Sequence, residues 1–258
     1  MKLLEHFLLI KTYFKNYTLS QEKKVYYSYI FMKKILINII LFLVVTSSLN
    51  AHTSHYKNIK KLEMEIFRDN KLIGYNYYFF SKDKDITKIT NQIKFKVKLF
   101  GATIFDVEGY SEEKYNKDKL ISFNSRTKQN KKEKFVNLLL DKKNDKFIIR
   151  GSSYIGEATT NNVIGNWWNH KLLQAESQIS PISGSIKKQV ITFIAKENIE
   201  LYGKNFETEH FKLTSKNNEL PDDKKLNFDI WFEKTTGLIL KIKYSRMGDW
   251  EYRLKSYE

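Results

Sequence analysis

Two adjacent tryptophans near the middle of the chain are the residues best suited to form a ligand site. Indole rings can line the mouth of an apolar pocket, and a neighbouring amide and imidazole can supply polar contacts at its rim. A leucine in the same segment and a tryptophan near the C-terminus extend the apolar surface. The candidate ligand-binding residues are therefore Trp167, Trp168, Asn169, His170, Leu173 and Trp231.

The same residues also have a purely structural interpretation. Adjacent residues on a helix point about 100° apart, so the rings of Trp167 and Trp168 cannot face one cavity equally. One ring would then fill the core and the other lie on the surface, while Asn169 or His170 binds backbone groups. Trp231 lies in a strand pattern, where aromatic residues commonly serve sheet packing. Both interpretations stay open at this point.

Patterns for catalysis and metal binding are weak. The chain has no cysteine, which excludes disulfides, thiolate metal sites and a cysteine nucleophile. No serine has the glycine spacing of a nucleophile elbow, and no two histidines of a predicted element have the spacing of metal ligands on a helix. The carboxylates of Glu112 and Glu113 are expected to be solvated, without the apolar pocket that raises a pKa for acid–base work. We expect no catalytic residue, no metal, no cofactor and no enzyme.

The basic charge is not that of a nucleic-acid reader. Lys and Arg number 45 against 29 Asp and Glu in 258 residues, which gives a formal net charge of +16. Only five of the cations are Arg, whose planar fork is the usual reader of bases and phosphates. A solvated lysine surface explains the charge better, and we expect no nucleic-acid partner.

Most of the chain after residue 55 alternates between apolar and polar residues. Ile93, Phe95 and Val97 interleave with Lys94 and Lys96, and the same period of two recurs in many segments. Successive side chains of a strand point to opposite faces, so this pattern predicts antiparallel strands with one buried face. Turn-forming residues separate the segments, for example at 69–70, 116–118, 142–145, 235–237 and 247–249. The fold class is mainly β, a large antiparallel sheet of about a dozen strands.

One interval, residues 161–185, lacks the period of two. Trp168, Leu172 and Leu173 can share one face of a helix, with Asn166 as a plausible N-cap and Pro181 beyond the helix end. We predict one short helix near residues 167–174 that crosses the open side of the sheet.

Residues 32–51 have the three parts of a signal peptide. Two lysines precede an apolar run, Ile35 to Val45, and a small polar tail ends at Ala51. The run is shorter than the roughly 20 residues of a membrane-spanning helix, so no permanent membrane span is expected after cleavage. We expect cleavage near Ala51, with cleavage after Ser48 as the alternative.

This assignment divides the chain into three parts. Residues 1–31 are interpreted as an over-extended reading frame, with Met32 as the true start; the alternatives are a genuine long leader or a short membrane-proximal helix. Residues 32–51 form the signal peptide. Residues 52–258 form a single all-β domain, which we expect in the periplasm of a Gram-negative bacterium.

Short blocks of the chain resemble a proteobacterial periplasmic family of unknown function. The resemblance covers most of residues 56–257. It rests on Gly74 after Leu72-Ile73, on Trp168-Asn169-His170, Leu172-Leu173, Gln174 and Ile182-Ser183-Gly184, and on the C-terminal blocks Asp229-Ile230-Trp231-Phe232, Gly237-Leu238 and Gly248-Asp249-Trp250-Glu251-Tyr252-Arg253-Leu254.

The resemblance implies a curled half-barrel similar to that of periplasmic lipoprotein carriers, in which a helix covers a concave apolar face. It implies no catalytic residue. The function that follows is an exported, non-catalytic protein that binds or carries a lipid-like, apolar ligand. The alternative is a structural or interaction protein of the cell envelope, with an envelope protein as partner and no small-molecule ligand.

Overall fold

The computed structural model describes residues 56, 58–222 and 224–258, which form one continuous sheet of 15 strands. The predicted signal peptide and the preceding extension lie outside the described residues. Among the residues that the structure describes, no helix has the length and apolar character needed to cross a membrane.

The first eight strands run from residue 61 to residue 159. They are β1 (Lys61–Arg68), β2 (Lys71–Asp83), β3 (Ile86–Leu99), β4 (Ala102–Asn116), β5 (Lys119–Gln129), β6 (Lys132–Asp141), β7 (Lys146–Gly151) and β8 (Ile155–Thr159). The remaining elements are β9 (Val163–Ile164), the 3-10 helix η2 (His170–Leu173), β10 (Ser177–Ile179), β11 (Ile186–Leu201), β12 (Lys204–Ser215), β13 (Asn227–Glu233), β14 (Leu238–Ser245) and β15 (Asp249–Tyr257).

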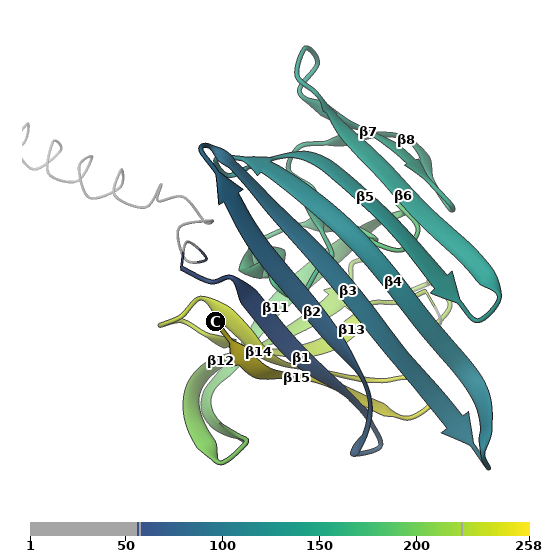
Figure 1. Cartoon of the computed structure of the whole chain (residues 1–258), viewed down its shortest axis with the longest axis vertical. Helices are drawn as coiled ribbons and strands as arrows, with labels where there is room; N and C mark the ends of the chain where they lie inside the picture. Colours follow the sequence, from purple (N-terminus) through teal and green to yellow (C-terminus); the bar gives the residue numbers. More distant parts are fainter. Residues whose placement is uncertain (1–55, 57, 223) are drawn as a thin grey trace, which may run out of the picture. The chain divides into compact units, whose positions relative to one another are not determined.

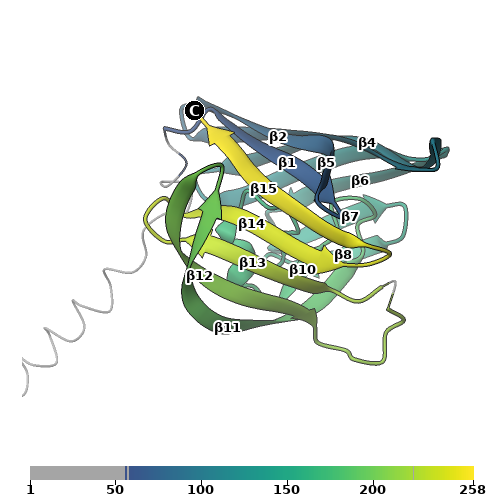
Figure 2. The same cartoon turned by 90° about the horizontal axis from the view of Figure 1, so that it is seen from below.

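The strand order explains how the sheet curls. It runs from β8 down to β1, then through β15 down to β9, and only the pair β9–β10 is parallel. The last strand therefore pairs with the first, and the two halves of the sheet face each other across this seam (Figures 1 and 2). The predicted fold class is confirmed. The two short strands β9 and β10, which the sequence pattern did not indicate, account for part of the difference from a dozen.

The predicted turns are also confirmed. Asp69 and Asn70 connect β1 to β2 with φ angles of 49° and 61°, the left-handed geometry of a two-residue hairpin. Met247 and Gly248 connect β14 to β15 with φ angles of 52° and 119°. Two hydrogen bonds join these turns: the backbone amide of Asp69 donates to the carbonyl of Asp249 at 2.8 Å, and the amide of Asp249 donates to the side-chain Oδ1 of Asp69 at 2.9 Å. Residues 180 positions apart thus meet at one end of the seam.

The alternation divides each strand between two faces as predicted. Phe95 and Val97 of β3 are buried on the inner face, whereas Lys94 and Lys96 are exposed on the outer face. The outer lysines pair across the ladder, Lys94 with Glu108 at 3.2 Å and Lys96 with an aspartate of β4 at 3.4 Å. Such exposed pairs contribute little stability, so the free energy of folding comes mainly from the inner face.

The segment that interrupts the pattern crosses between the two halves of the sheet, but its helix is shorter than predicted. The 3-10 helix covers His170–Leu173 rather than 167–174, and its N-cap is Asn169 rather than Asn166. Tertiary hydrogen bonds compete with a longer helix. Before the short helix, the side chains of Asn166 and Trp168 donate to Glu113 of β4. After its start, Nε2 of Gln189 donates to the carbonyls of Leu172 and Ala175 at 2.8 and 2.9 Å, so the segment is held by tertiary contacts at both ends.

Candidate functional site

Trp168 fills one end of the inner face. Its side chain is 2 % exposed, and its ring meets Tyr56, Phe80 and Tyr115 edge-on at centroid distances of 5.2, 5.6 and 5.8 Å. Edge-to-face packing is favourable for aromatic rings and adds to the hydrophobic gain of burial. Trp168 is therefore a core residue that fixes the crossing segment to the sheet.

A buried carboxylate completes this anchor. Glu113 of β4 is 1 % exposed, and it accepts hydrogen bonds from Nε1 of Trp168 at 2.8 Å, from the hydroxyl of Tyr115 at 2.6 Å and from the amide of Asn166. Burial raises the pKa of Glu113, and these three hydrogen bonds oppose the rise. The expectation that Glu113 is solvated is wrong, because adjacent residues of a strand face opposite sides. Glu112 faces outward and pairs with Lys88 at 2.7 Å.

Asn169 and His170 bind protein groups. Oδ1 of Asn169 accepts from the amide of Lys171 at 3.0 Å. Nδ1 of His170 lies 3.0 Å from the carbonyl oxygen of Gly237 and 3.0 Å from the hydroxyl of Tyr56, so it connects the crossing segment to the β13–β14 turn. Leu173 is partly buried and packs against the core. These three residues hold the segment in place.

A cavity of about 600 Å³ remains between the crossing segment and the inner faces of both halves of the sheet. This volume lies within the range of about 300–1,000 Å³ that small-molecule sites occupy. The apolar residues that line it come from β3, β4, β13, β14, β15, the crossing segment and the loop before β13. They include Ile93, Phe95, Val97, Ile104, Phe105, Val107, Trp167, Leu226, Phe228, Trp250 and Tyr252.

Four aromatic rings form one wall of this cavity. Trp250 stacks on Tyr244 at a centroid distance of 5.7 Å, Tyr244 meets the edge of Phe228 at 5.2 Å, and Phe228 meets Trp167 at 5.1 Å. We refer to these four residues as the aromatic wall. Because each ring is supported by the next, the wall is rigid and presents a large apolar surface at little entropic cost.

Several polar groups inside the cavity are already bonded within the protein. Nδ2 of Asn76 donates to the hydroxyl of Tyr78 at 3.0 Å, and Nδ2 of Asn91 donates to Asn76. The hydroxyl of Ser125 donates to the carbonyl of Pro181 at 2.6 Å, and a glutamine of β10 donates to Gln189. These groups need no ligand partner, so the interior favours apolar chemistry.

The structure brings only one of the six predicted ligand residues to this cavity. Trp167 lines it, whereas Trp168, Asn169, His170 and Leu173 anchor the segment that carries Trp167. Trp231 is at a different site, where Nε1 donates to Glu197 at 2.6 Å and the ring stacks on His210 at 4.5 Å. The remaining lining residues were indicated only as members of an apolar face. The alternation along each strand predicted which side chains face the inside of the sheet. It did not predict which of these side chains line a cavity and which pack against other residues.

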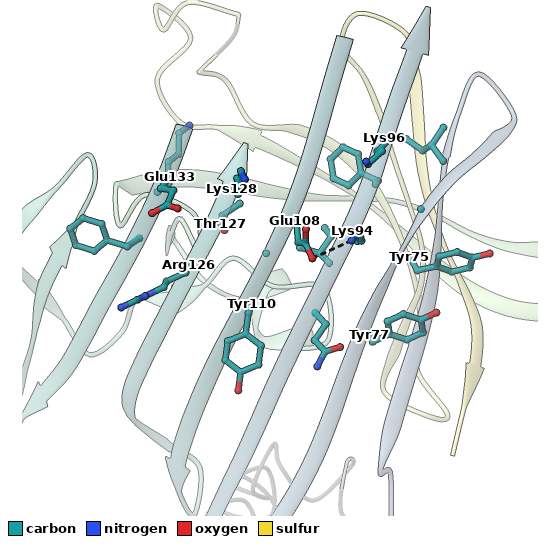
Figure 3. A pocket seen from close by; sticks show the side chains of 18 of the residues that line it. Tyr75, Tyr77, Lys94, Lys96, Glu108, Tyr110, Arg126, Thr127, Lys128 and Glu133 are labelled. Atoms are coloured by element: carbon teal, nitrogen blue, oxygen red, sulfur yellow. Dashed lines mark hydrogen bonds and ion pairs between the residues drawn. The ribbon is translucent and has the colours of Figure 1, made fainter. Parts of the chain in front are cut away.

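A larger hollow of about 1,150 Å³ lies on the outer face over β2–β6 (Figure 3). Its side chains are mainly polar or charged, and Lys94 and Glu108 form an ion pair within it. The rings of Tyr75 and Tyr77 stack on each other at 6.0 Å along β2. This surface is open to solvent and carries five basic and two acidic side chains, so the smaller inner cavity is the better candidate for an apolar ligand.

The described residues form no group of three or more His, Asp or Glu side chains that can hold a metal ion. His210 is bound on both sides, with Nδ1 2.9 Å from Glu197 and Nε2 3.0 Å from Asp229. The ring of His210 stacks on Trp231, and Lys212 pairs with Asp229 at 2.8 Å.

Comparison with known proteins gives a family and a fold. Residues 64–255 match a family described as "Domain of unknown function (DUF6134)". The structure is similar to that of a β-barrel-like protein of domain of unknown function DUF1849 from Brucella abortus. The TM-score is 0.52 at 7 % sequence identity, over 78 % of this chain and 96 % of the other. At this identity the likeness extends to the fold alone. No curated protein matches the sequence.

Proposed function

The chain belongs to the family described as "Domain of unknown function (DUF6134)", and from the geometry of its cavity we propose that it is a non-catalytic protein that binds a lipid-like, apolar ligand. The observation that carries the proposal is the cavity of about 600 Å³, lined by the aromatic wall and by aliphatic side chains of β3 and β4. A sheet closed on its own core would leave no such volume, because protein interiors are close-packed.

The expected affinity follows from the buried chain. Each methylene that leaves water contributes about 0.8 kcal/mol, and a micromolar dissociation constant corresponds to about 8 kcal/mol. A chain of about twelve carbons therefore contributes about 10 kcal/mol, which leaves about 8 kcal/mol for micromolar binding if immobilisation costs about 2 kcal/mol. The rigid aromatic wall keeps that cost small.

Binding is tested with purified protein after removal of copurified lipid. We expect the apolar dye N-phenyl-1-naphthylamine to gain fluorescence in the cavity with a micromolar dissociation constant and one site per chain. We also expect native mass spectrometry to show lipid-sized adducts before delipidation. Absence of both signals from a folded sample would reject ligand binding and leave the structural or interaction role in the cell envelope.

We also propose that the protein acts in the periplasm after export. The support is the signal-peptide pattern of residues 32–51, together with the resemblance to a proteobacterial periplasmic family. After expression in a Gram-negative host, the periplasmic protein is expected to begin near His52, as read by intact mass and N-terminal peptides. Recovery of any peptide from residues 1–31 in the exported protein would show that the start and the cleavage site are wrongly assigned.

A further inference from the structure

The cavity that is proposed to bind a ligand has a one-sided charge. Four basic side chains lie among its lining residues, and no Asp or Glu does. They are Arg68, Lys187, Lys225 and Arg246. In the chain as a whole, Asp and Glu make up 29 of the 74 charged residues. The cavity thus combines an apolar interior with cationic groups only, which is the complement of a molecule with an apolar chain and an anionic end.

Arg68 is held in a fixed position at the seam of the sheet. Its Nε donates to the carbonyl oxygen of Met247 at 3.1 Å, and one terminal nitrogen donates to the same oxygen. The guanidinium lies 5.8 Å from the centre of the Trp250 ring, at the end of the aromatic wall. A guanidinium has five N–H groups in a planar fork, and this arrangement leaves part of the fork for an anion.

The turn beside Arg68 is shaped to admit its side chain. A Cβ atom at Gly248 would lie 2.7 Å from Nε of Arg68 and 3.0 Å from its terminal nitrogen. The φ angle of Gly248 is 119°, which also favours glycine. The nearest described carboxylate oxygen, in Asp69, is 3.8 Å from Nε, so the charge of Arg68 is only partly balanced.

Arg246 lies on the same turn, is exposed, and places a second cation beside the cavity. Burial raises the pKa of Tyr244, and the positive charge of Arg246 opposes this rise. The field of Arg246 therefore reaches the aromatic wall. Met247, whose carbonyl binds Arg68, lines the cavity and is 85 % exposed, so the cavity opens to solvent beside the two arginines.

The ammonium groups of the two lysines, Lys187 and Lys225, are already bonded to other groups of the protein. Nζ of Lys187 donates to the carbonyl of Lys224 at 3.2 Å, and Nζ of Lys225 pairs with Asp222 at 2.9 Å. They add to the positive potential, whereas the arginines offer the directed hydrogen bonds that a carboxylate or phosphate accepts. The aromatic wall runs inward from Arg68 to Trp167 and gives the apolar chain its path.

We propose that the ligand is an anionic amphiphile, with a carboxylate or phosphate headgroup held by Arg68 and Arg246 and one apolar chain along the aromatic wall. This inference rests on the proposed function, because it specifies the ligand of the same cavity. The shared chemistry is an oxyanion on an apolar chain, as found in free fatty acids and in phosphate-bearing lipids.

Four dodecyl compounds that differ only in the headgroup test the inference: dodecanoate, dodecyl phosphate, dodecanol and dodecyltrimethylammonium. Each is titrated below its micelle concentration against the dye bound in the cavity. The anionic pair is expected to bind at least about tenfold more tightly than dodecanol, a difference of about 1.4 kcal/mol. The advantage is expected to shrink as salt is added, because the headgroup lies near solvent. The ratio of dodecanoate to dodecyl phosphate distinguishes a fatty acid from a phosphate-bearing lipid.

Variants assign the effect to the arginines. In Arg246→Gln and in the double variant Arg68→Gln/Arg246→Gln, dodecanoate and dodecyl phosphate are expected to lose most of their tighter binding relative to dodecanol. The affinity for dodecanol itself is expected to stay within about twofold of that of the parent protein. Lys131→Gln/Lys142→Gln removes two exposed charges from other turns and is expected to change neither affinity. The exposed Arg246 side chain makes the single variant the test of choice if the double variant does not fold.

The outcomes separate the two proposals. Equal affinity for dodecanol and dodecanoate, or a full anionic advantage in the folded Arg246→Gln variant, would overturn the headgroup inference and leave apolar binding intact. Failure of all four compounds to displace the dye, together with failure of the dye itself to bind, would reject the proposed function.

Discussion

Replacing Glu113 with alanine is expected to lower the free energy of unfolding by about 3 kcal/mol or more. The change leaves the indole N–H of Trp168, the amide of Asn166 and the hydroxyl of Tyr115 without their acceptor in a buried site. Each unsatisfied buried donor costs about 1–3 kcal/mol, and relief of the buried carboxylate offsets only part of the sum. Urea unfolding followed by tryptophan fluorescence measures the difference.

Glu113→Gln is the matched variant. Its carbonyl oxygen can still accept from Asn166 and Trp168, and its amide can donate to the hydroxyl of Tyr115. We therefore expect it to lose much less stability than Glu113→Ala. If both variants unfold at the same urea concentration as the parent, the hydrogen bonds of Glu113 do not anchor the crossing segment.

The pH dependence provides a second readout of the same group. Because burial raises the pKa of Glu113, the folded state binds this proton more tightly than the unfolded state, whose reference value is 4.5. Its contribution to stability is fully present below that unfolded value and is lost as the pH rises through the folded value. The stability of the parent relative to Glu113→Gln should therefore increase as the pH falls toward 4.5. A difference that does not change with pH would contradict the assignment.

Filling the cavity is expected to abolish ligand binding while the protein stays folded. Val107 lies on the inner face of β4 and lines the cavity beside Phe95, its partner on β3. In Val107→Trp the indole would occupy space that the apolar chain needs. Loss of about four buried methylenes corresponds to about 3 kcal/mol, or more than a hundredfold in affinity. The dye titration measures this loss.

The neighbouring position supplies the control. Glu108 is exposed on the opposite face of the same strand, so Glu108→Trp adds the same side chain outside the cavity. It is expected to bind the dye like the parent protein. Val107→Phe is a smaller obstruction for use if the tryptophan is not tolerated. Unchanged dye affinity in a folded cavity variant would place the ligand elsewhere, for example in the outer hollow.

The predictions from sequence succeeded where the signal is local. The alternation of Phe95 and Val97 with Lys94 and Lys96 follows from the geometry of a single strand, and the structure confirms which side is buried. The turn at Asp69 and Asn70 was likewise indicated by residues that tolerate left-handed backbone geometry.

They failed where distant residues decide the environment. In the sequence, Glu113 is one of two adjacent carboxylates with nothing to distinguish it. Only the fold brings Trp168 and Asn166, more than 50 residues away, to its carboxylate oxygens. The predicted helix at 167–174 is reduced to His170–Leu173, in a segment held by tertiary hydrogen bonds from Trp168 to Glu113 and from Gln189 to the carbonyl of Leu172. Trp167 and Trp168 are adjacent residues of the same type, yet Trp167 lines the cavity and Trp168 fills the core.

The sequence by itself determined an antiparallel sheet with one apolar face and the interval that interrupts its pattern. These features depend on periods of a few residues, which side-chain direction along a strand sets directly. Only the tertiary structure decided that part of the apolar face stays uncovered and that Arg68 and Arg246, 178 positions apart, stand together beside it. A cavity forms where side chains from many strands do not fill the space between them, so no single stretch of the chain predicts it.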